Sequence, residues 1–224
     1  MRKLLFLLLA LPALTVSYAE KFEPNTKWPY LYEDFTRGTI LFEGNNKTVS
    51  NLNIHLLGNV LHYVTPDGRI FESKDNGIIR VEIGKDAYIF SDHKMVKIIG
   101  NKGNNLLVLL KKADFDAMRT GNSGAYGSSL QSSASRDLSS LDLGGLNQPE
   151  LGKMLQEKED GREIPVMDTY YFIIDGQQID ATRKGVEEIL SPDKLEEFGS
   201  FVKQKKIKWK KEEGLLQVLE FLGK

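Results

Sequence analysis

Residues 38–110 read GTILFEGNNKTVSNLNIHLLGNVLHYVTPDGRIFESKDNGIIRVEIGKDAYIFSDHKMVKIIGNKGNNLLVLL, a series of short apolar runs separated by turn-forming residues. Gly, Asn and Asp mark most of the interruptions, and these residues readily adopt the positive φ angles of tight turns. Turn residues spaced about one strand apart predict consecutive antiparallel hairpins. The expected strands are the eight runs 39–42, 49–57, 60–64, 69–71, 78–83, 88–90, 95–99 and 106–110.

A further hairpin is expected much later in the chain. Residues 166–174 (VMDTYYFII) are rich in the aromatic and β-branched residues that favour strands. Asp175-Gly176 is typical of a type I′ turn, and residues 177–181 would form the return strand.

Three helical patterns follow this hairpin. Thr182 is expected to cap a short helix through residue 190. Ser191-Pro192 has the signature of an N-cap followed by proline at the first helical position, which predicts a helix to about residue 205. Residues 211–222 repeat the pattern, so the last two helices are expected to form an antiparallel pair. The residues expected to face inward in the first two helices are Val186, Ile189, Leu190, Leu195, Phe198, Phe201 and Val202.

The predicted fold class is therefore α+β. An N-terminal antiparallel β-meander or roll of short hairpins would be followed by a flexible Ser/Gly-rich excursion. A β-hairpin with two to three C-terminal helices would complete the chain.

The first 19 residues have the composition of a secretory signal peptide. Arg2 and Lys3 precede an apolar run over residues 4–16, and Ser17-Tyr18-Ala19 places small residues where a signal peptidase reads them. The run is too short for a stable membrane span. The chain has no cysteine, which excludes a disulfide scaffold and favours a bacterial exported protein. We expect cleavage after Ala19 and a location in the periplasm or outside the cell.

The remaining chain divides by composition into three parts. Residues 20–112 comprise an aromatic lead-in and the antiparallel β region. Residues 113–163 are expected to be a flexible Ser/Gly-rich loop or linker, since such a composition buries too little to offset its ordering entropy. A short helical turn is expected at 111–119 and a short helix at 149–158. Residues 164–224 hold the later hairpin and the helices, either as a separate unit or as one domain with 20–112.

Two histidines provide the one candidate metal site. If Gly58-Asn59 is a two-residue turn, His55 lies directly opposite His62 on the neighbouring strand, with Cβ atoms about 5 Å apart. That spacing could present two imidazoles to Zn²⁺ or Cu²⁺, with Asp92, His93 or water completing the shell. The alternative is a half-polar sheet face on which two histidines meet by chance, and no other cofactor is expected.

Three groups of residues are candidate binding sites. The aromatic lead-in either buries its rings against the sheet or offers Trp28, Tyr30 and Tyr32 as a platform for a sugar or peptide. Tyr126 would be a contact point in the Ser/Gly-rich segment. The basic run around Lys206, Lys208 and Trp209 could hold an anionic membrane surface, or could be a solvated turn whose lysine stems cover the tryptophan. These contact residues are Trp28, Tyr30, Tyr32, Tyr126, Lys206, Lys208 and Trp209.

No arrangement of nucleophile, base and orienting group emerges from the sequence, so an enzyme is the less favoured class. The chain holds 30 basic and 31 acidic residues, and this near balance argues against a protein that coats polyanions such as nucleic acid. The leading expectation is an exported, non-enzymatic protein that binds a protein, a glycan or an envelope component. The two alternatives are the histidine metal site and attachment to an anionic membrane surface; the oligomeric state is left open.

Overall fold

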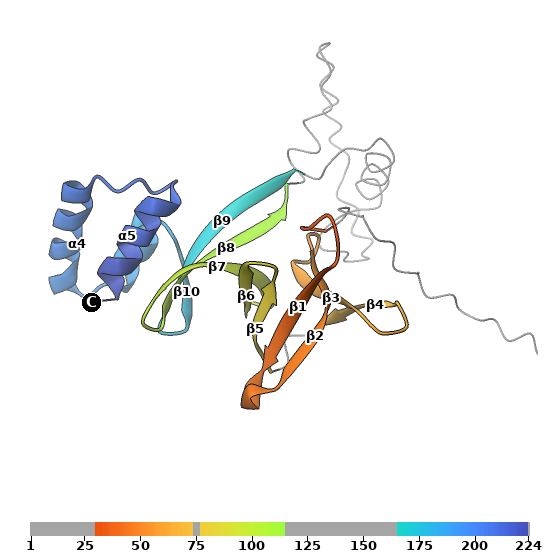
Figure 1. The fold of residues 1–224 in the computed structure, drawn as a ribbon. Helices are drawn as coiled ribbons and strands as arrows, with labels where there is room; N and C mark the ends of the chain where they lie inside the picture. The colour runs from red at the N-terminus through yellow and green to blue at the C-terminus, as the bar shows by residue number, and fades with distance from the viewer. Residues whose placement is uncertain (1–29, 74–76, 115–164, 224) are drawn as a thin grey trace, which may run out of the picture.

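The computed structural model describes residues 30–73, 77–114 and 165–223 (Figure 1). The predicted signal peptide, Trp28, the Ser/Gly-rich segment with Tyr126 and the expected helix at 149–158 lie outside the described residues. Everything below concerns the described part of the chain.

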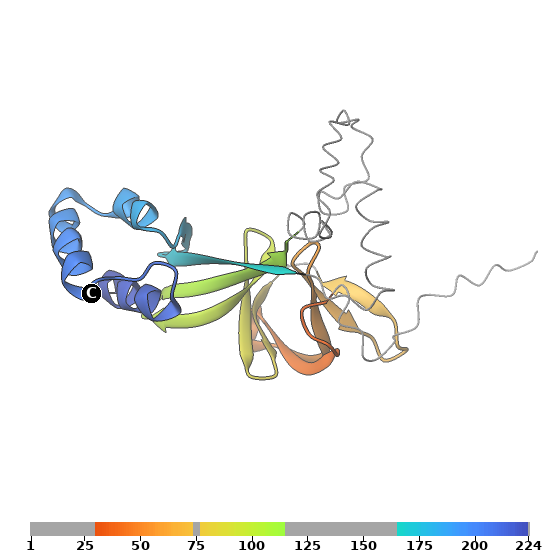
Figure 2. The ribbon, with the colours of Figure 1, turned by 90° about the horizontal axis from the view of Figure 1, so that it is seen from above.

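The described strands form one antiparallel sheet that curls into a half-barrel. The spatial order is β10-β9-β8-β7-β6-β5-β1-β2-β3-β4, so nearly every strand pairs with its neighbour in sequence. Figure 2 shows the N-terminal strands curving round while β8 and β9 extend towards the helices. The strands are β1 (Thr36–Phe42), β2 (Lys47–His55), β3 (Val60–Val64), β4 (Ile70–Ser73), β5 (Ile78–Ile83), β6 (Asp86–Ser91), β7 (Lys94–Lys102), β8 (Asn105–Ala113), β9 (Val166–Ile174) and β10 (Gln177–Asp180). A 3₁₀ turn, η1 (Glu43–Asn45), joins β1 to β2.

The turn residues of the sequence produce this meander. Asp175 and Gly176 have φ angles of 50° and 82°, which fit the predicted type I′ turn between β9 and β10. Gly84 and Gly103 also have positive φ in the tight turns after β5 and β7. Each of the eight apolar runs contains a strand, in the order expected, although residues 56–57 of the second run belong to the turn after β2. The α+β prediction is confirmed.

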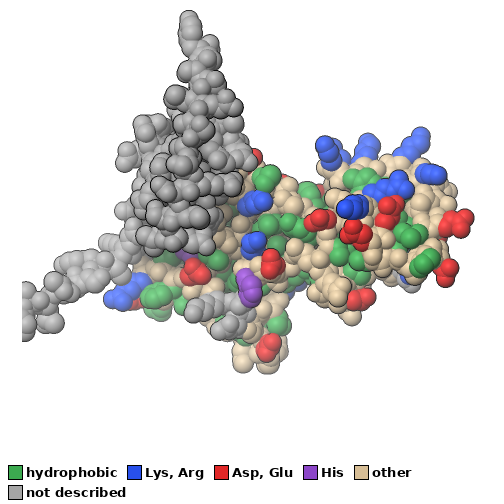
Figure 3. Space-filling view, turned by 180° about the vertical axis from the view of Figure 1, so that it is seen from behind, with side chains coloured by type: hydrophobic (Ala, Val, Ile, Leu, Met, Phe, Trp, Pro, Cys, Tyr) green, Lys and Arg blue, Asp and Glu red, His purple; other side chains and the backbone are tan. Residues whose placement is uncertain are grey.

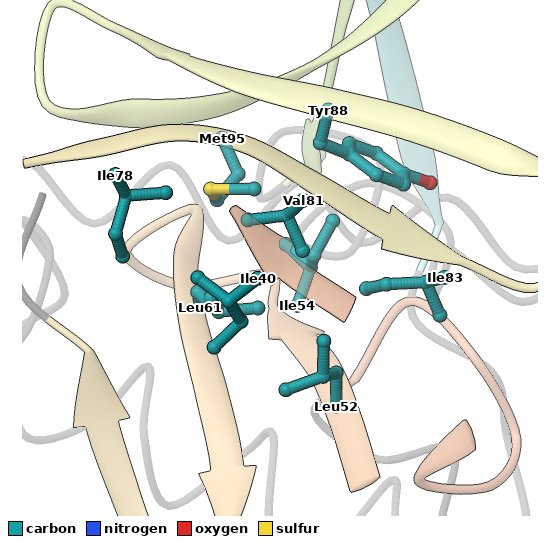
Figure 4. Packing of buried hydrophobic residues seen from close by; sticks show 9 residues of the cluster. All are labelled: Ile40, Leu52, Ile54, Leu61, Ile78, Val81, Ile83, Tyr88 and Met95. Carbon is teal, nitrogen blue, oxygen red and sulfur yellow. The ribbon is translucent and has the colours of Figure 1, made fainter. Parts of the chain in front are cut away.

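One hydrophobic core fills the inside of the curled N-terminal half (Figure 4). Its side chains come from β1, β2, β3, β5, β6 and β7, because every second residue of each strand points to the concave face. Leu52, Leu61 and Val81 are completely buried there. The full cluster of buried residues is Ile40, Leu52, Ile54, Leu61, Ile78, Val81, Ile83, Tyr88 and Met95.

A second core lies between the other half of the sheet and the C-terminal helices. These are α3 (Arg183–Ile189), α4 (Pro192–Lys205) and α5 (Glu212–Leu222), and Figure 1 shows α4 and α5 side by side at one end of the molecule. Helix α5 packs on β7 and β8. The buried residues of this core are Leu107, Phe172, Ala181, Val186, Phe198, Leu215, Val218, Leu219 and Phe221.

Two details of the sequence prediction are wrong. Residues 111–113 continue strand β8 instead of beginning a helical turn, because they pair with residues 166–168 of β9. Ile189 and Leu195 were expected to face the core but are 39% and 37% exposed. The predicted caps are confirmed: Thr182 accepts a hydrogen bond from the Gly185 N–H at the start of α3, and Ser191 is the N-cap of α4 with Pro192 at the first helical position.

Candidate functional site

The histidine pair lies on β2 and β3, but the predicted register is wrong by two residues. His55 pairs with Val60 and Asn53 pairs with His62, so the connection spans residues 56–59 instead of Gly58-Asn59 alone. Because the shift is an even number of residues, both histidines stay on the same face of the sheet. They are diagonal neighbours, not directly opposite each other.

The two imidazole rings nevertheless meet. Their centroids are 4.8 Å apart and their planes differ by 21°, which is a stacked arrangement. Tyr30 covers both rings edge-on, at 5.4 Å from His55 and 5.6 Å from His62. The Tyr30 hydroxyl and His62 Nδ1 share a hydrogen bond of 3.0 Å, and Phe35 packs on the other side of Tyr30 at 4.8 Å. The result is a small aromatic cluster built on β2, β3 and the segment before β1.

Burial keeps both histidines neutral around pH 7. Burial and, to a smaller extent, the neighbouring His62 lower the pKa of His55 from 6.5 to about 4. Burial also lowers the pKa of His62, although Glu72 partly opposes this effect. Glu72 stands opposite His62 in the β3–β4 ladder.

Stacked rings are a poor arrangement for one shared metal ion. The lone pair of an imidazole nitrogen lies in the ring plane, so two nearly parallel rings direct their lone pairs side by side. A zinc ion needs both nitrogens about 2.0–2.1 Å away and converging on it. The structure brings no set of three or more His, Asp or Glu together around a possible metal position within the described residues. Metal binding at His55 and His62 therefore stays a prediction and would require the rings to turn.

Asn53 explains why Tyr30 is held over the histidines. Its side chain is fully buried, with Oδ1 accepting from the Tyr32 N–H at 3.1 Å and the Ile54 N–H at 2.8 Å. Its Nδ2 donates to the carbonyls of Tyr32 at 2.9 Å and Asp34 at 3.2 Å. The backbone of Leu31 adds a hydrogen bond to the Ile54 carbonyl. One amide thus fixes the segment before β1 across the sheet.

Tyr32 belongs to a polar network on the concave face that the sequence did not indicate. Its hydroxyl donates to Asp86 Oδ2 at 2.9 Å and contacts the Tyr88 hydroxyl, while Lys97 Nζ lies 2.7 Å from Asp86 Oδ1. Burial, followed by these partners, raises the pKa of Tyr32 far above its ordinary value, and burial raises the pKa of Tyr88 to about 12. Both hydroxyls therefore stay protonated and act as hydrogen-bond donors.

An open hollow of about 620 Å³ was also missed by the sequence reading. It lies where the β1–β2 hairpin and the β3–β4 hairpin diverge (Figure 1), and we call it the fork. Pairing between β2 and β3 begins only at Asn51 and Val64, so no described strand pairs with the preceding residues of β2 on that side. The fork is lined by Arg37, Thr48, Val49, Ser50, Asn51, Tyr63, Val64, Thr65, Pro66 and Gly68.

The predicted contact residues that the structure describes lie in two places, before β1 and between α4 and α5. Tyr30 is buried and Tyr32 half-buried, so neither ring is an open platform. Lys206 and Lys208 are exposed between α4 and α5, while Trp209 packs edge-on against the buried Phe198, with centroids 6.3 Å apart. Trp28 and Tyr126 lie outside the described residues.

Comparisons with known proteins give no match, whether to protein-family models, curated proteins or solved structures. Within the described residues, no helix has the length and apolar character needed to cross a membrane.

Proposed function

We propose that this is an exported, non-enzymatic binding protein that takes an extended segment of a partner protein into the fork. The observation that carries the proposal is the edge of β2 next to the hollow, which no other described strand pairs with. Strand edges bind peptides by adding one more strand to the sheet, with backbone hydrogen bonds supplying affinity.

The direction of the backbone groups follows from the hairpin geometry. The Phe42 N–H donates to the Asn46 carbonyl, and antiparallel pairs alternate between hydrogen-bonded and non-bonded. Thr48 and Ser50 of β2 therefore exchange backbone hydrogen bonds with Ile40 and Gly38 of β1. Lys47 and Val49 direct their N–H and C=O groups to the other side of β2. Ile54 follows the same alternation as Thr48 and Ser50, because its carbonyl accepts a hydrogen bond from the Leu31 N–H on the β1 side of β2. Two residues thus offer four backbone groups to the fork.

The side chains around the fork suit a peptide. Val49 and Phe71 are 54% and 45% exposed, which is high for apolar residues in strands. Phe71 stacks with Tyr63, a lining residue, at a centroid distance of 6.1 Å. Arg37 adds a cation that can bind a carboxylate or a backbone carbonyl. Apolar contacts beside an open strand edge give sequence preference to a bound segment.

The Ser50 hydroxyl defines the inner end of this site. It donates to the Val64 carbonyl at 2.7 Å, where β3 leaves β2. A bound segment would therefore lie alongside Lys47–Val49, where β3 would run if it continued past Val64. The charge of Lys47 at the outer end disfavours edge-to-edge pairing of two copies, as lysines commonly do on exposed strand edges.

The experiment first selects peptides that bind the protein and then tests a variant that lacks a backbone donor at the edge of β2. A phage library of random dodecapeptides would be panned on the mature protein, and selected peptides measured by fluorescence anisotropy. Val49→Pro removes the N–H that faces the fork and leaves the bonded pairs of the β1 ladder intact, so peptide binding should fall at least tenfold. Val49→Thr, which keeps the backbone donors, is the matched control and should retain binding within about threefold.

Two results would contradict the proposal. One is the absence of any enriched peptide. The other is equal binding of the selected peptides by the parent and by a folded Val49→Pro variant. A glycan that binds both proteins equally on an array would favour the glycan alternative instead.

A further inference from the structure

Six lysines surround the connection between α4 and α5, and we call this surface the basic turn. All six side chains are exposed, and none takes part in an ion pair among the described residues. Figure 3 shows basic side chains projecting along one edge of the helical end of the molecule. The six residues are Lys203, Lys205, Lys206, Lys208, Lys210 and Lys211.

The basic turn is held in one conformation by apolar anchors. Ile207 and Trp209 pack into the helical core, so the lysines between and beside them face outward. The Ile207 N–H bonds to the Val202 carbonyl, and the Lys211 N–H bonds to the Lys208 carbonyl. A Cβ at Gly214 would lie 2.4 Å from the Lys208 carbonyl oxygen, so the chain passes α5 at the closest possible approach. The lysines are therefore presented on a packed and hydrogen-bonded support.

Two of these lysines occupy positions where local stability favours another residue. Lys206 ends α4 with φ 50° and ψ 50°, the left-handed conformation for which glycine is preferred. Lys211 is the N-cap of α5 without a side-chain hydrogen bond, and its charge sits at the positive end of the helix dipole. The dipole of α4 favours the charges of Lys203, Lys205 and Lys206, but it explains neither the choice of lysine for the left-handed position 206 nor the charge of Lys211. Residues that depart from local preference are concentrated at functional sites.

We propose that the basic turn docks on the surface of an anionic phospholipid bilayer. The whole chain has a formal net charge of −1, so attraction to an anionic surface has to come from a local patch. The turn lies at a protruding end of the molecule and not in a groove, which suits a flat surface better than a linear polyanion. Along the chain, the acidic residues next to the turn are Glu212 and Glu213 in the first turn of α5, and Glu212 is engaged by the Tyr170 hydroxyl at 2.8 Å.

The binding would be electrostatic and reversible. Ile207 and Trp209 are turned into the core and are not available for insertion between lipids. Binding should therefore be abolished when the salt concentration rises from about 0.1 M to about 1 M, where the Debye length falls to about 3 Å.

Vesicle sedimentation of the full mature chain tests the proposal. The probes are vesicles of phosphatidylcholine alone and of phosphatidylcholine with phosphatidylglycerol. The parent should sediment only with the anionic vesicles. The triple variant Lys206→Gln, Lys208→Gln and Lys210→Gln should bind about a hundredfold more weakly, at roughly fivefold per lysine. The matched control carries Lys85→Gln, Lys94→Gln and Lys184→Gln, which are exposed elsewhere, and should bind as the parent does.

Lys206→Gly and Lys211→Ser separate binding from folding. Both replacements suit the local backbone, so each should raise the thermal midpoint while weakening vesicle binding. The proposal is overturned if the parent ignores anionic vesicles, or if the control triple variant loses as much binding as the test triple variant. Binding to heparin or to an oligonucleotide without vesicle binding would also overturn it and would assign the turn to a different class of polyanion.

Discussion

Acidification should lower the free energy of unfolding by about 2–3 kcal/mol through one residue, His55. Its pKa of about 4 in the folded chain lies below the ordinary value of 6.5, so the unfolded chain binds the extra proton first as the pH falls. The stability that neutral His55 provides is fully present above pH 6.5 and is lost as the pH falls towards 4. With about 1.4 kcal/mol per pH unit, the loss is roughly 2 kcal/mol at pH 5 and roughly 3 kcal/mol at pH 4.

Urea denaturation between pH 7.5 and pH 4 measures this effect. Paired carboxylates also lose stabilising contacts in acid, so the informative quantity is the difference between the parent and His55→Phe, which keeps an aromatic ring in the stack. The parent should lose about 2–3 kcal/mol more than the variant over this range. His93→Gln, at the exposed third histidine in the β6–β7 turn, is the comparison variant for the loss of one histidine. If the free energy of unfolding changes with pH in the same way for the parent and for His55→Phe, the assignment of a buried neutral imidazole is refuted.

Other predictions concern the scaffold and the metal hypothesis. Asn53→Ala removes four hydrogen bonds of a fully buried amide and should lower the free energy of unfolding by about 3 kcal/mol in urea denaturation. The control Asn101→Ala, at an exposed position, should lower it by less than about 0.5 kcal/mol. Equal losses would contradict the anchoring role of Asn53. Gly38→Ala would place a Cβ 2.3 Å from the Glu82 carbonyl oxygen and should destabilise the protein by at least about 2 kcal/mol, so a neutral effect would argue against this packing of β1 on β5. Elemental analysis after dialysis should find no stoichiometric zinc or copper in the parent or in His55→Ala, since the rings are stacked; stoichiometric metal lost in the variant would restore the metal site.

Local chemistry was sufficient to predict most of the elements. Asp175-Gly176 and Thr182 act through their own backbone preferences, so their turn and cap could be read without knowledge of the fold. Alternating apolar residues likewise placed Leu52, Ile54 and Leu61 on one face. These features depend on neighbours in sequence.

The β2–β3 register could not be read in this way because a distant strand sets it. The Asn59 carbonyl accepts a hydrogen bond of 2.7 Å from the Met95 N–H at the start of β7, and Leu56 is buried at 3% exposure. The hydrogen bond and the burial of Leu56 both depend on the curl of the sheet, and with them residues 56–59 form a longer connection than Gly58-Asn59 alone. The same curl brings Tyr32 to Asp86 and Tyr88, which lie 54 and 56 residues later in the chain.

The fork could not be predicted from the sequence for a related reason. Its lining residues look like ordinary strand residues, and only the point at which β3 leaves β2 exposes the backbone of Lys47 and Val49. Sequence patterns report which residues form strands but not where pairing stops. The basic turn was visible as a charge run, whereas the inward packing of Trp209 was decided by Phe198 on α4.

Backbone amide exchange followed by NMR tests the peptide-binding account most directly. In the free protein, the N–H groups of Lys47 and Val49 should exchange quickly, while those of Thr48 and Ser50, which bond towards β1, should exchange slowly. Addition of a selected peptide should slow the exchange of Lys47 and Val49 at least tenfold. Unchanged fast exchange at both positions with the peptide bound would contradict the account, as would slow exchange at both positions in the free protein.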